Sequence, residues 1–446
     1  MNKSVELASA EQAPGLPATW DVIVCGGGTA GVVAAIQAGR AGARTLLVEK
    51  TGMLGGTVTT AGVNYPGLFY AWGKQVIAGI GWELVARSVA EAGGKMPDFT
   101  WGPGRTHWPQ QVRIERPVFA ALCDEAVVQA GVDVLCHVML AEVAAAPDGW
   151  RMTVCTKTGL RAVQAKVLID CTGDANAVTL AGLPLNVPPE CQPATLICHA
   201  SGYDPAALDL AALNRAYEQA VQRGELQCTD VGWNTATPDL GGWLRKAGEN
   251  ANHIHNINAR DSESKTRLEL EARAAFLRLY RFLRRQPGCA GLRIEYLAPE
   301  CGVRETVTIV GKQTVTVDDY VSGRVWPDAV CHAFYPIDLH SSQGNGIVGR
   351  PLQEGVVPTI PRGALLPAGS RNLLVAGRCL ASDRLANSAL RVQAPAMATG
   401  QAAGAIAALA ARSGVEAEAV PMPEIRRLLR EHGAIVPEPA GPHCTD

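Results

Sequence analysis

The chain has 446 residues, of which 47% are hydrophobic, so it can bury a large core, and at roughly 100–200 residues per domain we expect two or three compact units. Its formal net charge of -2 argues against a protein whose main task is to grip nucleic-acid phosphates. The 13 cysteines include no Cys-x-x-Cys pair, so we expect no metal site and a reducing, cytoplasmic location.

The N-terminal residues 1–19 predict a flexible tail. They carry Glu6 and Glu11 and lack the apolar stretch of a signal peptide. No apolar run in the sequence reaches the ~18 residues needed to cross a bilayer. The Ala-rich segment 402–411 predicts a buried helix, and we therefore expect no membrane span.

The first informative pattern is a β-branched strand, 22–25, that runs into a glycine cluster and then into a helix from Gly31 to Ala41. Gly26 permits a tight turn, and Gly28 lets the backbone approach a pyrophosphate. Gly31 lets the helix pack closely against the strand. This order is typical of a dinucleotide-binding unit, and the alternative is a glycine turn that binds no ligand.

The helix start and the following strand complete this unit. Thr29 and Ala30 lie at the helix N-terminus, where unpaired N–H groups and the positive dipole end attract phosphate. The strand 45–48 ends at Glu49, where a carboxylate can accept hydrogen bonds from ribose hydroxyls. Lys50 follows directly, and the group Gly55-Gly56-Thr57 would let the backbone run beside a larger cofactor.

The middle of the chain predicts β-structure. We expect strands at Val132–Ala146, Trp150–Thr156 and Ala162–Ile169, separated by glycine-containing turns. The last strand runs into Gly173 and Asp174, which form another glycine turn after an apolar strand.

Residues 372–412 predict a second wall of the site. A strand at 372–375 ends at Gly377 and Arg378, and a long helix with Pro395 near its start follows. The positive N-terminus of that helix would suit the pyrimidine edge of a flavin. Two walls so distant in sequence favour a long, extended cofactor, and hence FAD rather than NAD.

With these motifs the chain resembles the bacterial FAD-dependent oxidoreductases of the glutathione-reductase-type fold, which are related to fumarate reductase and succinate dehydrogenase flavoproteins. The resemblance covers residues 21 to about 412 and rests on VIVCGGGTAGVVAAIQAGRAGARTLLVEK, MLGGTVTTAGV, VLIDCTGDANAV, CGVRETVTIVG and NLLVAGRCLASD with SALRVQAPAMATGQAAG. Some branches of this family attach the flavin covalently through His or Cys; the sequence contains no motif that requires such a link, so we expect non-covalent FAD.

The resemblance also implies a place for each group of motif residues along the cofactor. Gly26, Gly28 and Gly31 would surround the pyrophosphate, Glu49 would bind the adenosine ribose, and Gly55, Gly56 and Thr57 would line the flavin end. Gly173 and Asp174 would lie near the adenine or pyrophosphate, Gly377 and Arg378 on the ribityl side, and Arg391 and Val392 at the pyrimidine edge.

We therefore predict an α/β fold in which a discontinuous, Rossmann-like FAD-binding domain carries an inserted α+β substrate domain. The FAD-binding domain would comprise 20–60, 112–190 and 346–412. The substrate domain would be 191–345, with an amphipathic helix at 262–285. The segment 61–111 would be a lid or a subunit contact, which leaves a homo-oligomer open, and 413–446 would form a terminal helix and tail. No second glycine fingerprint lies between 190 and 345, which weakens any case for a separate NAD(P)H domain.

Candidate catalytic groups come from polar stretches of the predicted substrate domain. His253 and His255 alternate, so on an extended strand they would face one side, and His255 is our candidate base. A second polar-aromatic stretch contains His332, Tyr335 and His340. For each histidine alone, a structural role is the alternative.

Two arginines are candidates for binding or stabilising negative charge. Arg304 could orient an anionic or carbonyl group, the alternative being an ion pair with Glu305. Arg391 could stabilise the flavin electrostatically, the alternative being a pair with Asp383.

The expected function is that of a dehydrogenase or oxidase acting on a small organic substrate. It would move a hydride from a C–OH, C–NH or CH–CH unit to flavin N5 and pass the electrons to oxygen, a quinone or another acceptor. One alternative is a fumarate-reductase-like reductase of an activated double bond. Another is a non-catalytic FAD-holding module in a complex, although the lack of a basic stripe counts against nucleic acid as its partner.

Overall fold

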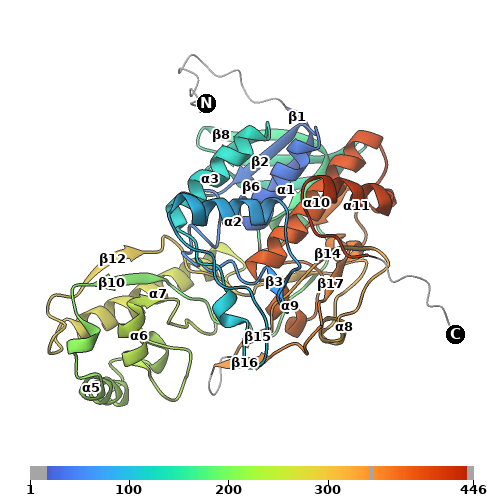
Figure 1. Ribbon diagram of the computed structural model, residues 1–446. Helices are drawn as coiled ribbons and strands as arrows, with labels where there is room; N and C mark the ends of the chain where they lie inside the picture. Colours follow the sequence, from blue (N-terminus) through green and yellow to red (C-terminus); the bar gives the residue numbers. More distant parts are fainter. Residues whose placement is uncertain (1–17, 342–345, 439–446) are drawn as a thin grey trace.

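A seven-stranded sheet forms the centre of the computed structural model, which describes residues 18–341 and 346–438. Residues 1–17 of the expected N-terminal tail and 439–446 of the expected C-terminal tail lie outside this range. The path of the sheet is β5-β2-β1-β8-β7-β6, with β18 also paired to β8 (Figure 1). Its strands are β1 (Thr19–Cys25), β2 (Thr45–Glu49), β5 (Asp133–Cys136), β6 (Met139–Ala146), β7 (Gly149–Thr156), β8 (Gly159–Asp170) and β18 (Leu373–Val375).

Strand β8 joins two kinds of pairing. Strands β5, β2, β1, β8 and β18 are parallel, whereas β6, β7 and β8 form an antiparallel meander. One edge of β8 pairs first with β7, up to Ala165, and then with β18, from Leu168 to Asp170. As a result, the residues after β18 lie beside the carboxyl ends of β1 and β8, although about two hundred residues separate them from β8 in the chain.

The single long strand predicted for 132–146 is wrong. His137 has a left-handed backbone (φ 59°) and donates its N–H to Thr51 O, which ends β5 and lets the chain reverse into β6. The change of direction is required because β5 pairs parallel to β2 whereas β6 pairs antiparallel to β7.

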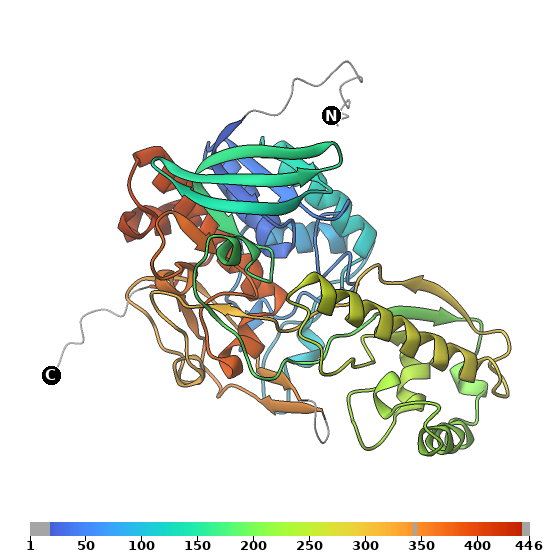
Figure 2. The same cartoon turned by 180° about the vertical axis from the view of Figure 1, so that it is seen from behind.

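Helices cover the parallel part of the sheet, and the antiparallel meander lies on the opposite side of the molecule, as Figure 2 shows from behind. They are α1 (Thr29–Arg40), α2 (Ile80–Glu91), α3 (Arg116–Gln129), α10 (Gln393–Ser413) and α11 (Met422–Glu431). The predicted first helix is confirmed and begins two residues earlier than expected. The terminal helix predicted within 413–446 is present as α11.

Helices α1 and α10 pack closely against each other. A Cβ atom on Gly400 would overlap Ala30 O, and one on Gly404 would overlap Ala34 O, so only glycine permits this approach. Among the described residues, α10 is the one helix long and apolar enough to cross a membrane, and its most apolar window is completely buried in the structure. The apolar, small-residue composition of α10 is explained by this burial and by its close packing against α1.

A second lobe, at the lower left of Figure 1, holds a three-stranded sheet and three helices. The sheet contains β11 (Gly248–Glu249), β10 (Cys198–Ser201) and β12 (Arg293–Leu297); the helices are α5 (Leu210–Gln222), α6 (Leu240–Lys246) and α7 (Ser262–Leu283). Helix α7 confirms the amphipathic helix predicted for 262–285. The buried side chains of this lobe come from residues 194–301.

The remaining elements pack with the large sheet. They are the paired strands β3 (Tyr70–Ala71) and β4 (Lys74–Gln75), β9 (Leu185–Asn186) and β13 (Thr308–Ile309), β14 (Ala329–His332) and β17 (Thr359–Pro361), β15 (Ile337–His340) and β16 (Ile347–Arg350), and the helices α4 (Asn176–Leu180), α8 (Val317–Ser322) and α9 (Arg384–Leu390). Buried side chains from 307–337 and from α2 belong to the main core. We therefore propose an inserted unit of about 194–301, narrower than the expected 191–345.

Candidate active site

A cavity of about 1210 Å³ lies at the carboxyl ends of the parallel strands and extends to the second lobe. Its walls include the turn after β1, the end of β2, the turn after β8 and the start of α10. Ligands of open α/β sheets bind at this edge. The volume exceeds the roughly 300–1,000 Å³ of ordinary ligand pockets, so it can hold a long cofactor together with a small substrate.

The two glycine groups predicted to flank the cofactor meet in space. Gly55 N donates to Gly27 O at 2.8 Å, and a Cβ on Gly56 would lie 2.7 Å from Gly28 Cα. Gly28 itself has open space where its Cβ would be, and it lines the cavity. This cradle, which a side chain at Gly28 would fill, fits a pyrophosphate at the N-terminus of α1.

The other residues of these motifs divide between the cavity wall and the packing behind it. Gly26, Thr29, Ala30 and Thr57 line the cavity. Gly31 and Gly55 do not; a Cβ on Gly31 would overlap Gly26 O, so this glycine permits the helix–strand contact.

Glu49 ends β2 and lines the cavity, but protein donors already hold its carboxylate. Oε2 accepts from Gly27 N at 2.6 Å, and Oε1 accepts from the N–H and hydroxyl of Thr51, each at 2.8 Å. A carboxylate offers about four acceptor positions, so about one is left for a ribose hydroxyl. Lys50, at the rim, forms an ion pair with Glu300 at 2.8 Å.

Arg378 ties the turn after β18 to the turn after β8. It donates to Gly173 O at 2.7 Å and to Val303 O, and it pairs with Asp174 Oδ1 at 2.5 Å. Gly377 and all of these residues line the cavity. The guanidinium thus fixes the shape of this wall, and its charge is balanced by Asp174.

Arg391 and Val392 lie between α9 and α10 and line the cavity. Arg391 does not pair with Asp383, which caps α9 by accepting from Ala386 N. It pairs instead with Asp338 Oδ2 at 3.6 Å, and its buried Nε has no hydrogen-bond partner.

Arg304 is buried, with 9% of its surface exposed, and lines the cavity. It donates to Pro193 O at 2.7 Å, Thr195 Oγ1 at 2.9 Å and Asn250 Oδ1 at 3.3 Å. The alternative pair with Glu305 does not form, because Glu305 binds Arg384 at 3.0 Å. Burial and the charge of Arg391 lower the pKa of Arg304 to about 9.

The loop that carries Asn250 has an unusual backbone. Ala247, Glu249 and Asn256 have φ values of 56°, 52° and 61°, a left-handed conformation that residues other than glycine adopt at a cost. Such conformations persist where the surroundings hold them, and they cluster at functional sites.

A chain of three side chains runs from the cavity into the protein. Asp338 Oδ2 lies 3.3 Å from His340 Nε2, and His340 Nδ1 lies 2.9 Å from His253 Nε2. Asp338 and His340 line the cavity, whereas His253 lies behind them. In the described ranges, no group of three His, Cys, Asp or Glu side chains is arranged to hold a metal ion.

The charge of Asp338 determines the tautomers of both imidazoles. Burial raises its pKa, but the hydrogen bond from His340 and the charge of Arg391 outweigh this effect, so the pKa lies below its usual value. Burial and Arg304 lower the pKa of His340 to about 4, and burial lowers that of His253. A neutral His340 therefore donates from Nε2 to Asp338 and accepts at Nδ1 from His253 Nε2–H.

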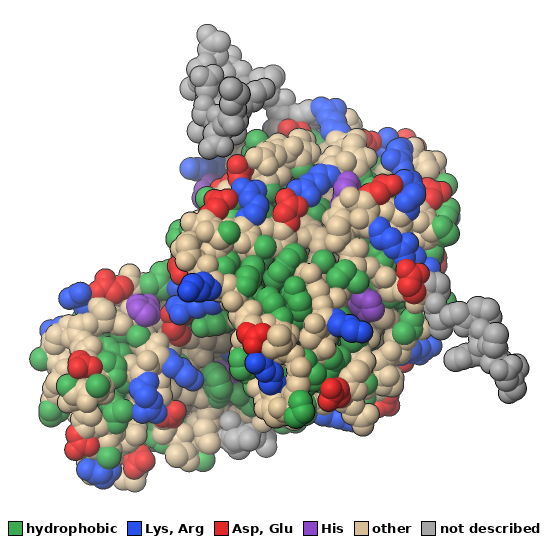
Figure 3. All heavy atoms as spheres, viewed as in Figure 1, with side chains coloured by type: hydrophobic (Ala, Val, Ile, Leu, Met, Phe, Trp, Pro, Cys, Tyr) green, Lys and Arg blue, Asp and Glu red, His purple; other side chains and the backbone are tan. Residues whose placement is uncertain are grey.

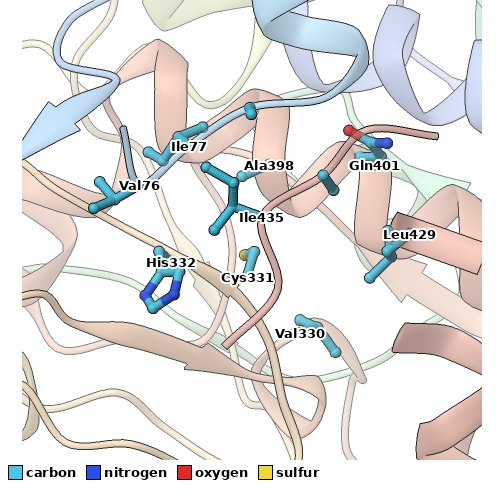
Figure 4. A pocket seen from close by; sticks show the side chains of 11 residues that line it. Val76, Ile77, Val330, Cys331, His332, Ala398, Gln401, Leu429 and Ile435 are labelled. Carbon is cyan, nitrogen blue, oxygen red and sulfur yellow. The ribbon is translucent and has the colours of Figure 1, made fainter. Parts of the chain in front are cut away.

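Of the other candidate catalytic residues, Tyr335 lines the cavity, whereas His255 and His332 do not. Tyr335 lines the cavity and packs edge-on against Trp108, at 5.8 Å between ring centroids. His255 lies 5.5 Å from the His253 ring, does not line the cavity, and both of its ring nitrogens are buried without a partner. His332 lies in a separate cavity of about 10 Å³ (Figure 4), which has room for at most about one water.

Asp338, Asn250 and Trp233 also line the cavity, beside the predicted residues, although the sequence pattern did not predict them. Asp338 could have been found, since Asp338 and His340 are two apart on β15 and therefore share a face. Asn250 and Trp233 had no comparable signal.

On the face of the molecule seen in Figure 3, basic and acidic side chains are interspersed, without a basic stripe.

The family model described as FAD dependent oxidoreductase matches residues 21–429. No curated protein matches the chain in sequence.

Solved structures that are similar share little sequence. A geranylgeranyl bacteriochlorophyll reductase-like protein from Thermoplasma acidophilum is 18% identical over 93% of this chain and 83% of that chain, with a TM-score of 0.43. The p-nitrophenol 4-monooxygenase from Pseudomonas putida DLL-E4 is 13% identical over 89% and 79%, with a TM-score of 0.36. An anhydrotetracycline hydroxylase from Streptomyces rimosus is 17% identical over 42% of this chain and 38% of that chain, with a TM-score of 0.31. At these scores the similarities carry no functional argument.

The family match covers nearly the whole chain, and the cradle at Gly28 together with the unpartnered Arg391 Nε fits a bound dinucleotide. The chain belongs to the FAD-dependent oxidoreductase family, and it is an enzyme whose cofactor is FAD.

Proposed function

We propose that this oxidoreductase removes a hydride from a C–OH, C–NH or CH–CH unit of a small organic substrate. The supporting observation is that the cavity continues beyond the glycine turns to a polar end walled by Arg304, Asp338, His340 and Arg391. Bound FAD supplies the hydride acceptor. The relation to fumarate reductase flavoproteins and the glutathione-reductase type of the fold are likewise part of this proposal.

Arg391 and the start of α10 hold the pyrimidine end of the cofactor in this proposal. Arg391 has an unused buried N–H, and the N-terminal end of α10 contributes positive potential. Together they stabilise negative charge where it develops in the site.

Asp338 takes up the proton that leaves a substrate O–H or N–H group, and His340 holds the Asp338 carboxylate in place through its Nε2–H. They face the cavity and are hydrogen-bonded to each other, whereas His255, the base expected from the sequence, lies away from the cavity wall. His253 is a positioning residue, because its Nε2–H holds His340 in one tautomer.

The reverse direction, reduction of an activated double bond, uses the same groups. Asp338, held by His340, would then deliver a proton, and Arg304 would polarise a carbonyl or carboxylate.

An anaerobic screen distinguishes the two directions. The purified yellow protein is mixed with alcohols, amines and saturated acids, and loss of the visible flavin absorbance is recorded. Bleaching by a donor supports the dehydrogenase or oxidase. Failure of every donor to bleach, combined with recovery of the colour of dithionite-reduced protein by an unsaturated acid, would replace it with the reductase.

A further inference from the structure

The polar end of the cavity holds more positive than negative charge. Arg304 and Arg391 both line it, and Asp338 is the carboxylate that pairs with one of them. Glu305, which adjoins Arg304 in the chain, is already paired with Arg384. Because His253 and His340 are neutral, two guanidiniums and one carboxylate leave a net charge of +1 in this group.

Arg304 is the less compensated of the two cations. A guanidinium has five N–H groups. Three of those on Arg304 donate to the neutral oxygens of Pro193, Thr195 and Asn250, and two are left. Within residues 18–341 and 346–438 no carboxylate forms an ion pair with Arg304.

A buried cation without a counter-ion is costly, because the interior solvates charge poorly. The lowered pKa of Arg304 reflects this cost, since burial and the like charge of Arg391 both oppose its protonated form. An anion that enters from solvent would remove the imbalance.

We propose that the substrate carries a carboxylate group and that this group binds to Arg304, next to Arg391. This inference rests on the proposed function, because it names the substrate class for the same cavity. Guanidinium and carboxylate can form two parallel hydrogen bonds, which orients the substrate as well as attracting it. A monoanion brings the group to neutrality, whereas a phosphate dianion would leave an uncompensated negative charge.

Equilibrium dialysis of the FAD-loaded wild-type protein tests the charge preference directly. The probes are acetate, succinate and benzoate, each compared with its uncharged amide, together with inorganic phosphate. We expect at least one carboxylate to bind tenfold or more tightly than its amide. Equal affinities for acids and amides, or tighter binding of inorganic phosphate, would overturn the proposal.

Two variants locate the binding group. Arg304→Gln should weaken carboxylate binding at least tenfold. Arg304→Lys should have an intermediate effect, because it keeps the positive charge but cannot form the two parallel hydrogen bonds of a guanidinium. Arg362→Gln is the matched control, since Arg362 is a half-buried arginine that donates to Val420 O outside the cavity. Its carboxylate affinity should equal that of the wild type.

Asn250→Asp provides an independent test if Arg304→Gln loses its FAD. The new carboxylate would stand where Asn250 Oδ1 now lies, 3.3 Å from Arg304 Nη2, and would neutralise the guanidinium without removing it. Carboxylate binding should fall at least tenfold while amide binding is unchanged. Unaltered carboxylate affinity in Asn250→Asp would sink the inference.

The two proposals fail separately. Carboxylates that bind through Arg304 to a protein that no donor bleaches would leave the anion site standing and remove the dehydrogenase. Bleaching by neutral alcohols or amines at equal rates in the wild type and in Asn250→Asp would leave the dehydrogenase standing and remove the anion site.

Discussion

Glu49 Oε2 accepts a hydrogen bond of 2.6 Å from the backbone N–H of Gly27. The end of β2 therefore holds the glycine turn after β1 in place before any cofactor binds. The carboxylate has both a structural and a binding role, whereas the sequence pattern indicated only ribose binding.

Replacing Glu49 by Gln should weaken both roles. An amide has a single acceptor oxygen, so it cannot serve Gly27 and Thr51 together, and the unfolding free energy should fall by about 1–3 kcal/mol. Thermal unfolding and the rate of FAD release would show this. Glu300→Gln, which removes the carboxylate partner of the exposed Lys50, should cost no more than about 1 kcal/mol. Equal losses in the two variants would contradict the role of Glu49.

Gly28→Val should give a folded protein with little bound FAD. The φ angle of Gly28, -68°, suits any residue, and its Cβ would meet no protein atom within 4 Å, so the side chain would occupy cofactor space rather than strain the fold. We expect a loss of roughly tenfold or more in FAD affinity, measured by the 450 nm absorbance per mole of protein. Gly102→Val is the control, because Gly102 also has open space and lies outside the cavity. A fully yellow Gly28→Val protein would refute this account of the cradle.

His340→Asn and His255→Asn should differ in the rate of flavin reduction. His340 bonds to Asp338 and lines the cavity, so its loss should slow the reductive half-reaction ~100-fold or more. His255 lines no part of the cavity and should have a small effect. Stopped-flow absorbance with a substrate found in the donor screen measures both. Similar rates in the two variants would remove His340 from the reaction.

The pH dependence of stability should report on His107. Burial lowers its pKa to about 4, and its ring packs against Trp101, with 4.3 Å between centroids. Between pH 6.5 and about 4 the unfolded chain therefore binds a proton that the folded protein excludes, so stability falls as the pH falls. Allowing for its partial exposure, the loss is about 1 kcal/mol.

His107→Phe should keep the ring contact and remove that loss. Melting temperatures of the two proteins should be close at pH 8, and the variant should be the more stable at pH 5. A difference that does not change with pH would show that His107 does not titrate in this way.

The sequence predicted the dinucleotide-binding unit well, because strand, glycine turn, helix and acidic residue follow one another locally. It did not predict the partners of Arg304 and Arg391. Neighbours such as Glu305 and Asp383 were the natural candidates, yet Glu305 pairs with Arg384 and Asp383 caps α9. Pairings that join distant strands depend on the packed fold, and for the same reason His340 rather than His255 reached the cavity.

The shared edge of β8 has a consequence for biosynthesis. Val375 pairs with Asp170, so the last wall of the cavity is translated about two hundred residues after the strand that receives it. A nascent chain that has emerged only as far as β16 presents its phosphate cradle without Gly377 or α10. Stable FAD capture therefore has to wait until β18 and α10 have been synthesised, and truncation before β18 would give a colourless product.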